Sequence, residues 1–489
     1  MGKKPAAAES EDRDNLGVTV TRKEDFSKWY LEVVRKGGFK DQRTPVKGFD
    51  VILPWGYCVW ESLVKVYDDL LKKDGVQNCY FPLLIPESFI EKEKEHFSGF
   101  EAETANVTEV GGEKLNEKLA IRPTSETIVY HMFSMWIRSY KELPMKINQW
   151  CNIVRWDTKV TKPFIRDREF LWSEVHTAHA TREDCLMQID RYVEIVGKFH
   201  ESMAVAALVL QRTENDKFPG AEFSIAYDTL VQDGKVFQGP GGHFLGQNFS
   251  KPFGINFMDE KGKREHVWQT CLGMTTRQIG GLIMQHGDDK GAVLPPSVAP
   301  VQVVIVPILF KGKEKSVMEA VKTVENEMCR MGIRVQADSR DYSAGFKFNH
   351  WELKGVPLRI EIGPRDVEEG AVTTVRRNDG RKGKIMLSEL GKIRETLDEI
   401  QREMYKKSKD FLKENTRDVK DMEELKQSVK AGGFSRACWC GSKECEDWVK
   451  DQTGASIRGT LYGKKEKVFG GCVYCEKNAS QVVYIAKAY

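Results

Sequence analysis

Glu169-Phe-Leu-Trp-Ser-Glu-Val-His176 combines the pattern of a β-strand with side chains that carry chemistry. Successive side chains of a strand point to opposite faces. The two faces therefore carry Phe170, Trp172, Glu174 and His176 on one side, and Leu171, Ser173 and Val175 on the other. A face that combines two aromatic rings with a carboxyl group and an imidazole is unsuited to a hydrophobic core. The stretch predicts a strand that borders a binding site; in the alternative, Glu174 and His176 only satisfy each other beneath a loop.

A second strand is expected just before this one. Residues 147–156 are rich in apolar and aromatic side chains, and the strand is expected to end at Arg155. The loop that follows contains four basic side chains: Lys159, Lys162, Arg166 and Arg168. Guanidinium and ammonium groups bind phosphate oxygens through charge-assisted hydrogen bonds. The predicted hairpin is therefore suited to hold a polyphosphate.

An amphipathic helix is expected further upstream. Its apolar side chains recur at helical spacing, at Trp60, Leu63, Val64, Tyr67, Leu70 and Leu71. This spacing places them in one stripe, and Gly75 is expected to end the helix. A short strand is expected at residues 78–81, directly before Pro82.

The composition indicates a multidomain globular protein. The 489 residues exceed one ordinary domain, and a hydrophobic content of 40% is enough to form two or three cores. The 75 basic and 72 acidic side chains leave a net charge of +3, so any surface for nucleic acid must be a local patch. No segment reaches the about 20 apolar residues that cross a bilayer, and the first fifteen residues lack the apolar core of a signal peptide. We expect a soluble cytoplasmic protein with no membrane partner.

Changes in sequence character divide the chain into four parts. A polar tail is expected at residues 1–17, and the first large domain at 18–298. Pro295, Pro296 and Pro300 mark a hinge, followed by an apolar run at 301–310 that is typical of a strand buried on both faces. A small α/β domain with a mixed sheet is expected at 299–400. A helical segment and a cysteine-rich end complete the chain at 401–489.

Four cysteines near the end of the chain have the spacing of a zinc site. Four residues separate Cys440 from Cys445, two separate Cys472 from Cys475, and 26 lie between the pairs. Two such pairs can supply four thiolate ligands to Zn²⁺. The absence of a histidine or a water-bearing position indicates a structural site. Cys438 is an alternative ligand, and buried reduced thiols are the alternative interpretation of the cluster.

Several motifs together resemble the class II aminoacyl-tRNA synthetases. Arg155, Asp157 and Phe170 resemble the arginine, acid and phenylalanine of motif 2, although the family usually has Glu at the position of Asp157. Residues 273–277 resemble motif 3, and residues 60–82 resemble motif 1. Four short segments are similar in sequence to prolyl-tRNA synthetases of the eukaryotic and archaeal type, at residues 122–126, 149–156, 168–174 and 245–251.

The resemblance implies a mixed α/β fold and a two-step reaction. It implies an α+β catalytic core with the antiparallel sheet of class II synthetases, an α/β anticodon-binding domain, and a small zinc-containing α+β domain at the carboxyl end. The implied reaction activates L-proline with ATP to prolyl-adenylate and transfers the prolyl group to tRNA(Pro). Motif 1 implies a homodimer. The alternatives are another class II synthetase, such as one for threonine, glycine or histidine, and a catalytically silent relative that binds RNA.

The resemblance also implies the nucleotide site. Arg155 is expected at the α-phosphate and the proline carboxylate, Arg277 at the γ-phosphate, and Phe170 on the adenine ring. These two arginines are the expected catalytic residues. Mg²⁺ is expected to bridge the phosphates. The remaining nucleotide contacts implied by the family are Asp157, Arg166, Asp167, Gln238, Gly241 and Thr275. For Gln238 and Thr275, a role as plain polar linkers is the alternative.

The proline and anticodon sites follow from the same resemblance. Proline carries two N–H donors, for which Thr124 and Glu126 are the expected acceptors. The rest of the implied proline site consists of Arg155, Trp172, Glu174, His176, Phe218, His243 and Cys271. The expected anticodon contacts are Arg359, Glu361 and Arg365, although a solvated basic face would explain their charge equally well. Tyr489 is expected to reach back toward the catalytic domain.

Overall fold

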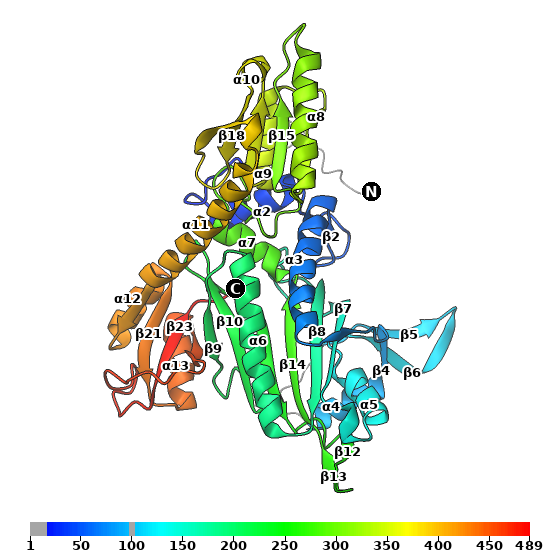
Figure 1. The fold of residues 1–489 in the computed structure, drawn as a ribbon. Helices are drawn as coiled ribbons and strands as arrows, with labels where there is room; N and C mark the ends of the chain where they lie inside the picture. Colours follow the sequence, from blue (N-terminus) through cyan, green and yellow to red (C-terminus); the bar gives the residue numbers. More distant parts are fainter. Residues whose placement is uncertain (1–16, 97–102) are drawn as a thin grey trace, which may run out of the picture.

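A long mixed sheet forms the centre of the molecule in the computed structural model, which describes residues 17–96 and 103–489 (Figure 1). Its eleven strands are, in spatial order, β20 (Thr416–Val419), β21 (Phe434–Trp439), β23 (Gln481–Ala486), β22 (Ser456–Leu461), β9 (Leu208–Gln211), β10 (Phe223–Leu230), β11 (Val236–Gly246), β14 (Trp268–Thr275), β8 (Glu169–His179), β7 (Met145–Val154) and β3 (Gln77–Asn78). The pairs β3–β7 and β20–β21 are parallel, and the others are antiparallel. The expected mixed α/β fold with a largely antiparallel sheet is confirmed.

Four helices cover one face of the central strands and build the main hydrophobic core. They are α2 (Phe26–Lys36), α3 (Pro54–Lys73), α6 (Arg182–Ser202) and α7 (Arg277–His286). The predicted stripe on α3 is confirmed, because Trp60, Leu63, Tyr67 and Leu71 are all buried in this core. The helix ends before Gly75, whose φ of +82° suits glycine.

The strand expected at residues 78–81 is shorter than predicted. Only Gln77–Asn78 pairs with β7. Phe81 instead donates its backbone N–H to the side chain of Gln149, at 3.1 Å. The chain leaves the sheet there because a side chain, and not a neighbouring strand, satisfies its backbone.

Smaller elements lie around the central sheet. The helices are α4 (Glu87–His96) and α5 (Glu126–Trp136), and the strands are β1 (Lys40–Asp41), β2 (Val51–Ile52), β4 (Leu84–Pro86), β5 (Asn106–Val110), β6 (Glu113–Ile121), β12 (Asn256–Met258) and β13 (Arg264–His266). Helix α5 contributes Val129, Tyr130 and Phe133 to a second core that also contains Cys271 of β14. The central sheet is thus covered on both faces near β8 and β14.

A five-stranded mixed sheet forms the next unit, at the top of Figure 1. Its order is β16 (Val335–Ala337), β15 (Val303–Pro307), β17 (Leu358–Ile362), β18 (Ala371–Arg376) and β19 (Lys382–Met386). The helices are α8 (Glu314–Arg330), α9 (Ala344–Lys354) and α10 (Pro364–Glu368). Strand β15 is buried at every position, and its neighbours β16 and β17 run parallel to it. The predicted mixed sheet is confirmed, and the buried strand exists but is shorter than the apolar run at 301–310, since Leu309 and Phe310 are exposed.

The last part of the chain extends the central sheet. Helix α11 (Lys392–Glu414) leads to α12 (Met422–Ala431), α13 (Lys443–Thr453) and the strands at the end of the sheet. Strand β22 pairs with β9, which joins the carboxyl-terminal strands to the central strands of the sheet. Asp228 of β10 is fully buried at this junction, with Arg212 and Arg458 bonded to its carboxylate at 2.6 Å each. Among the described helices, none is both long and apolar enough to cross a membrane.

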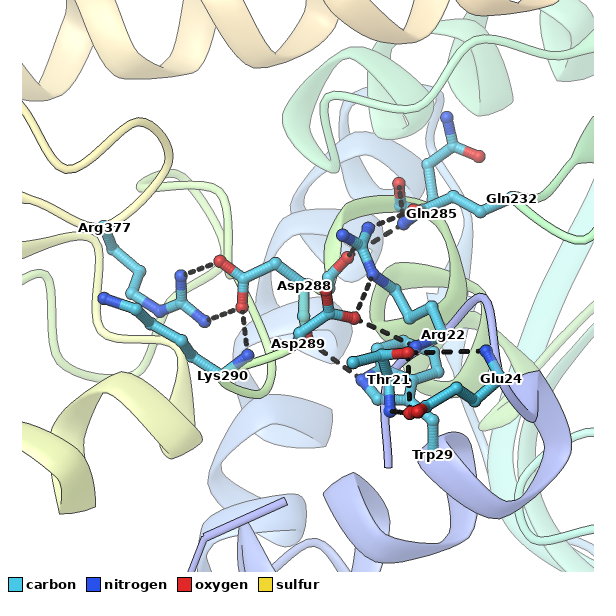
Figure 2. A network of polar contacts seen from close by, with 11 residues as sticks. Thr21, Arg22, Glu24, Trp29, Gln232, Gln285, Asp288, Asp289, Lys290 and Arg377 are labelled. Atoms are coloured by element: carbon cyan, nitrogen blue, oxygen red, sulfur yellow. Dashed lines mark hydrogen bonds and ion pairs between the residues drawn. The ribbon is translucent and has the colours of Figure 1, made fainter. Parts of the chain in front are cut away.

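A polar network holds the five-stranded unit against the loop after α7 and the amino-terminal part of the described chain (Figure 2). The loop after α7 lies at its centre. Asp288 accepts two hydrogen bonds from Arg377, at 2.5 and 2.6 Å, and Arg377 also donates to the carbonyl oxygen of Glu352. The adjacent Asp289 instead accepts from the backbone and side chain of Arg22, at 2.9 and 3.0 Å. Two neighbouring acids thus fix two different parts of the chain to one loop.

This arrangement predicts that mutations of Asp288 and Asp289 affect different segments of the chain. Replacement of Asp288 by Ala should increase amide hydrogen exchange in residues 371–378, because Arg377 loses a bidentate partner whose hydrogen bonds contribute about 1.5–3 kcal/mol. Replacement of Asp289 by Ala is the matched control and should increase exchange near Arg22 instead. Equal effects of both variants on both segments would show that the network does not divide in this way.

Candidate active site

A cleft of about 330 Å³ opens beside the hairpin of β7 and β8. The register of the hairpin places Glu174 opposite Gln149 and Trp172 opposite Cys151. Among the residues that line the cleft are thirteen of the expected site residues: Thr124, Glu126, Arg155, Phe170, Trp172, Glu174, Phe218, Gln238, Gly241, His243, Cys271, Thr275 and Arg277. Leu171 points away from the cleft and packs against the main core. The alternation predicted for this strand is therefore confirmed.

Two buried carboxylates form one end of the cleft. Thr124 donates its hydroxyl to Glu126, and the backbone N–H of Ser125 donates to Glu174 at 3.1 Å. Gln149 donates its side-chain amide to Ser125 and to Glu174, at 2.6 and 3.3 Å. The start of α5 therefore places Glu126 beside Glu174 of β8. The hydrogen bonds leave the carboxylates facing a cleft that can accept a cation.

His176 lies behind these carboxylates and balances part of their charge. Its Nε2 is 3.2 Å from Glu174, and its Nδ1 is 3.1 Å from the hydroxyl of Tyr130. The expected pair of Glu174 and His176 therefore exists, but Glu174 also lines the cleft, so the two side chains do not merely satisfy each other.

Burial and charge shift the pKa values of these groups in different directions. Burial, together with the charge of Glu174, raises the pKa of Glu126. Burial would also raise the pKa of Glu174, but the charge of His176 and hydrogen bonds from His176 and Ser125 outweigh it and lower that pKa. Burial opposes the charged form of His176, but Glu174 outweighs this effect and raises the pKa of the imidazole. The group therefore favours an ionised Glu174 next to a protonated His176.

Aromatic rings form the wall next to the carboxylates. Phe218 stacks on His243, with ring centroids 4.8 Å apart, and Trp172 meets Phe170 edge to face at 6.2 Å. Burial, followed by the charge of Arg212, lowers the pKa of His243 to about 3, so its ring is neutral. Its Nδ1 lies 2.8 Å from the hydroxyl of Ser224. A neutral stacked ring and an indole make this wall suitable for a small apolar ring.

Two arginines supply positive charge to the same cleft. The guanidinium of Arg155 lies 5.6 Å from the ring centroids of both Phe170 and Trp172, and its Nε donates to the carbonyl oxygen of Pro123. Arg277 is the first residue of α7 and donates to the carbonyl oxygens of Ile165 and Gln238. Burial lowers the pKa of Arg277 to about 10, with Arg166 and Arg155 adding to the effect. Two cations near a helix amino terminus are suited to a polyanion.

Three expected nucleotide contacts do not line the cleft. Asp157 is exposed in the loop after β7, and Arg166 is exposed and donates to the carbonyl oxygen of Tyr489 at 2.6 Å. Asp167 is buried and pairs with Lys40 at 2.7 Å. Its carboxylate also accepts the backbone N–H of Phe164 at 2.9 Å. In this arrangement Asp167 holds the loop of the hairpin together.

Six residues of the cleft lining are not among the expected site residues: Asp216, Lys217, Pro219, Gly239, Leu272 and Gly273. Asp216, Lys217 and Pro219 flank Phe218 in the loop between β9 and β10 and contribute to the cleft wall. The segment has no periodic pattern, so its sequence contains no signal that identifies these residues. Gln149 and Ser125, which hold Glu174, were also missed as members of the site. Their proximity depends on the pairing of β7 with β8 and on the start of α5.

Tyr489 packs against the catalytic region, as expected. Its backbone N–H donates to Val236, and its hydroxyl donates to Asp233 at 2.5 Å. Its ring lies between the ammonium groups of Lys162 and Lys235, with distances of 4.3 and 4.7 Å from the ring centroid. The carboxyl-terminal strand thereby reaches the loop that contains Arg166.

A second cavity, of about 390 Å³, lies in the five-stranded unit. Arg359 lines it together with Glu352, Trp351, Arg376 and Arg377. The guanidinium of Arg359 bonds Glu361 and Glu352 at 2.9 Å each and lies 4.0 Å from the centroid of the Phe348 ring. Of the other expected anticodon residues, Glu361 is the partner of Arg359, and the exposed Arg365 lies on α10, outside the cavity lining.

The four predicted zinc ligands lie close together. The Sγ atoms of Cys440, Cys445, Cys472 and Cys475 are all within 4.8 Å of one another. Tetrahedral coordination by thiolates at about 2.3 Å requires sulfur atoms about 3.8 Å apart, and the distances from Cys440 to Cys445 and Cys475 are 3.5 and 3.9 Å. The residues fit the metal. Cys438 is not in this group; its Sγ accepts the backbone N–H of Phe469.

Comparison with protein-family models identifies three parts of the chain. Residues 107–286 match the tRNA synthetase class II core domain (G, H, P, S and T), and residues 302–396 match an anticodon binding domain. Residues 422–489 match the carboxyl-terminal domain of prolyl-tRNA synthetases. The three matches follow the order expected from the sequence.

Similar proteins and structures cover almost the whole chain. The proline–tRNA ligase of Cenarchaeum symbiosum is 43% identical over 97% of this chain and 100% of its own length. The chloroplastic and mitochondrial proline–tRNA ligase of Arabidopsis thaliana is 44% identical over 98% of this chain and 89% of its own length.

Two crystal structures of prolyl-tRNA synthetase from Cryptosporidium parvum are also similar. The complex with halofuginone and AMPPNP has a TM-score of 0.92 and 40% identity, and the complex with L-proline and AMP has a TM-score of 0.90 and 38% identity. Each covers 97% of this chain and 100% of the solved chain. The chain therefore belongs to the class II prolyl-tRNA synthetases, the ligases that join proline to transfer RNA with the use of ATP.

Proposed function

We propose that the 330 Å³ cleft is where this chain forms prolyl-adenylate from L-proline and ATP. The observation that carries the proposal is that one cleft is lined by groups of opposite charge: the buried carboxylates of Glu126 and Glu174, and the guanidinium groups of Arg155 and Arg277. Attack of the proline carboxylate on the α-phosphate requires alignment and neutralisation of negative charge. The cleft offers a cation site for the amine and a polyanion site for the phosphates, side by side.

The carboxylate end suits the secondary ammonium of proline. Its two N–H groups need two acceptors, which Thr124 Oγ1 and the Glu126 carboxylate can supply. Because burial and Glu174 raise the pKa of Glu126, a bound ammonium would restore the ionised form of this carboxyl. Trp172, Phe218 and His243 would enclose the apolar ring. Cys271 of β14 also lines this pocket.

The arginine end suits the triphosphate. Arg155 is proposed to hold the α-phosphate and the proline carboxylate, and Arg277 the γ-phosphate. The face of Phe170 is proposed to carry the adenine ring, with Gln238, Gly241 and Thr275 nearby. Arg166 and Asp157 are proposed to contact ATP from the loop of the hairpin. Mg²⁺ would supply additional charge neutralisation at the phosphates.

The arginine assignment predicts a selective loss of chemistry. Replacement of Arg155 or Arg277 by Ala should reduce proline-dependent ATP–pyrophosphate exchange by at least about 10²-fold, because each charge acts on the transition state. Circular dichroism and thermal melting should remain close to those of the wild type. The exposed Arg330 provides a control, and Arg330→Ala should retain normal exchange. Near-normal exchange in the Arg155 or Arg277 variant would contradict the assignment.

The cavity around Arg359 is proposed to bind the anticodon. Phe348 can stack on an unpaired base, and the edges of Arg359 and Glu352 offer donors and acceptors for base recognition. Glu361 orients Arg359 through its 2.9 Å bond. Arg365 is proposed to contact the surrounding backbone phosphates.

This proposal predicts that tRNA charging and proline activation can be separated. Replacement of Arg359 by Gln should raise the KM for tRNA about 10–100-fold, which corresponds to about 1–3 kcal/mol for a base contact. Replacement of the exposed Arg365 by Gln should have a smaller effect. Pyrophosphate exchange, measured without tRNA, should be unchanged in both variants. A parallel loss in charging and exchange would show that Arg359 supports the fold rather than tRNA binding.

We also propose a structural Zn²⁺ at Cys440, Cys445, Cys472 and Cys475. Bound zinc would join the start of α13 to the 472–475 turn. The four side chains supply the thiolate charge and the geometry that this metal requires. The carboxyl-terminal domain that contains the four cysteines is small, and small domains depend on a bound metal or a similar cross-link for stability.

The zinc proposal predicts about one zinc per chain in the purified protein. Replacement of Cys445 by Ser should reduce the zinc content and increase hydrogen exchange in residues 434–486, because a bound metal contributes directly to folding. Cys438→Ser is the matched control, since this thiol lies outside the cluster, and it should retain zinc. Atomic spectroscopy that finds no zinc in the wild type would rule the site out.

A homodimer and a cytoplasmic location complete the proposal. A groove of about 460 Å³ along α3 is lined by Tyr57, Trp60 and Val64, and this helix belongs to the segment that resembles motif 1. All eleven cysteines lie in the described residues and none of them forms a disulfide, which fits a reducing compartment.

A further inference from the structure

The loop between β9 and β10 forms one wall of the catalytic cleft. Asp216, Lys217, Phe218 and Pro219 of this loop all line the cleft. The loop is tied within itself by the backbone N–H groups of Asp216 and Lys217, which donate to the carbonyl oxygen of Thr213 at 3.2 and 3.0 Å. Phe218 is therefore positioned by a turn that begins at Thr213.

A glutamate from the cysteine-rich unit holds this turn. Glu446 lies in the first turn of α13, directly after Cys445, and is only 9% exposed. Both of its carboxylate oxygens are bonded to the loop: Thr213 donates its hydroxyl to Oε1 at 2.8 Å, and Asn215 donates its side-chain amide to Oε2 at 2.6 Å. Hydrogen bonds to an ionised carboxylate are stronger than those between neutral groups.

A second contact from the same unit supports the loop on its other side. Arg458 of β22 bonds the buried Asp228 at 2.6 Å, and its guanidinium also lies 3.9 Å from Asp216. Arg212 lies 3.7 Å from the same Asp216 carboxylate. The carboxyl-terminal unit therefore contacts the cleft loop at Thr213, Asn215 and Asp216, immediately before Phe218.

We infer that Glu446 is a positioning residue for the amino-acid pocket, acting through Thr213 and Asn215 on the loop that carries Phe218. The inference rests on the proposed function, in which Phe218 and His243 enclose the proline ring. Glu446 does not line the cleft, and the two cleft arginines are bound to different segments, at Pro123, Ile165 and Gln238. Loosening the loop should therefore weaken proline binding more than ATP binding.

Substitutions at Glu446 test this separation in pyrophosphate exchange. Glu446→Ala removes both acceptors and should raise the KM for proline about tenfold, with kcat and the KM for ATP changed by less than about twofold. Glu446→Gln keeps one oxygen but places an amide donor against another donor, so its effect should be smaller. Glu444→Ala changes an exposed acid on the same turn of α13 and should leave all three constants unchanged.

Substitutions at Thr213 test the same contact from the catalytic side. Thr213→Val keeps the shape but removes the hydroxyl, and it should raise the KM for proline, whereas Thr213→Ser should restore the wild-type value. Hydrogen exchange in residues 211–222 should increase in Glu446→Ala and Thr213→Val but not in Thr213→Ser. Metal analysis accompanies each variant, and if Glu446→Ala loses its zinc, the Thr213 pair decides the outcome.

Phe218→Ala distinguishes failure of the inference from failure of the proposed pocket. If this variant leaves the KM for proline unchanged, Phe218 is not part of the proline pocket and the proposed function is wrong at this residue. If it raises the KM for proline while Glu446→Ala and Thr213→Val leave both the KM and the loop exchange unchanged, the pocket stands and the role of Glu446 is overturned. Equal increases in the KM for proline and for ATP would also overturn it.

Discussion

Strand β8 is the constraint on which the rest of the structure depends. It is hydrogen-bonded on both edges, to β7 and β14, so its register cannot shift without breaking two ladders. One face supplies Val175 to the main core, and the other supplies Phe170, Trp172 and Glu174 to the cleft. A shift of the register by one residue would exchange these faces and place the cleft side chains in the hydrophobic core. The packing that stabilises the fold therefore also sets the geometry of the site.

The stability of this arrangement depends on pH through the buried charged groups near β8. Glu174 has a lowered pKa, so its contribution is present above the ordinary carboxyl pKa and is lost as the pH falls through the lowered value. His176 has a raised pKa, so its contribution is present below the ordinary imidazole pKa and is lost as the pH rises through the raised value. Both contributions coexist at mildly acidic pH. Glu126, whose pKa is raised, opposes folding in its ionised form and is instead suited to bind a cation.

Local patterns in the sequence identified individual strands and helices, because strand alternation and helix spacing are themselves local, whereas most of the cleft residues were expected only from the resemblance to class II synthetases. The faces of β8 and the stripe on α3 could be inferred in this way. The strand at residues 78–81 was predicted too long, since its end depends on the side chain of Gln149 far along the chain. Asp167 was expected at the nucleotide but pairs with Lys40, a partner that no local pattern indicates. The loop at Asp216 has no periodicity, so only the tertiary structure reveals it.

The carboxyl-terminal unit has a closer relation to catalysis than its position in the sequence suggests. Strand β22 continues the central sheet from β9, and the loop that leaves β9 forms a wall of the cleft. Any rotation of this unit would therefore move the edge strand, Arg458 and Glu446 together. A unit with a small core can resist such rotation only if its own segments are joined, and the cluster of four cysteines lies where α13 begins, one residue before Glu446. A rigid cysteine cluster therefore restrains the first turn of α13, and through Glu446 this turn restrains the loop of the amino-acid pocket.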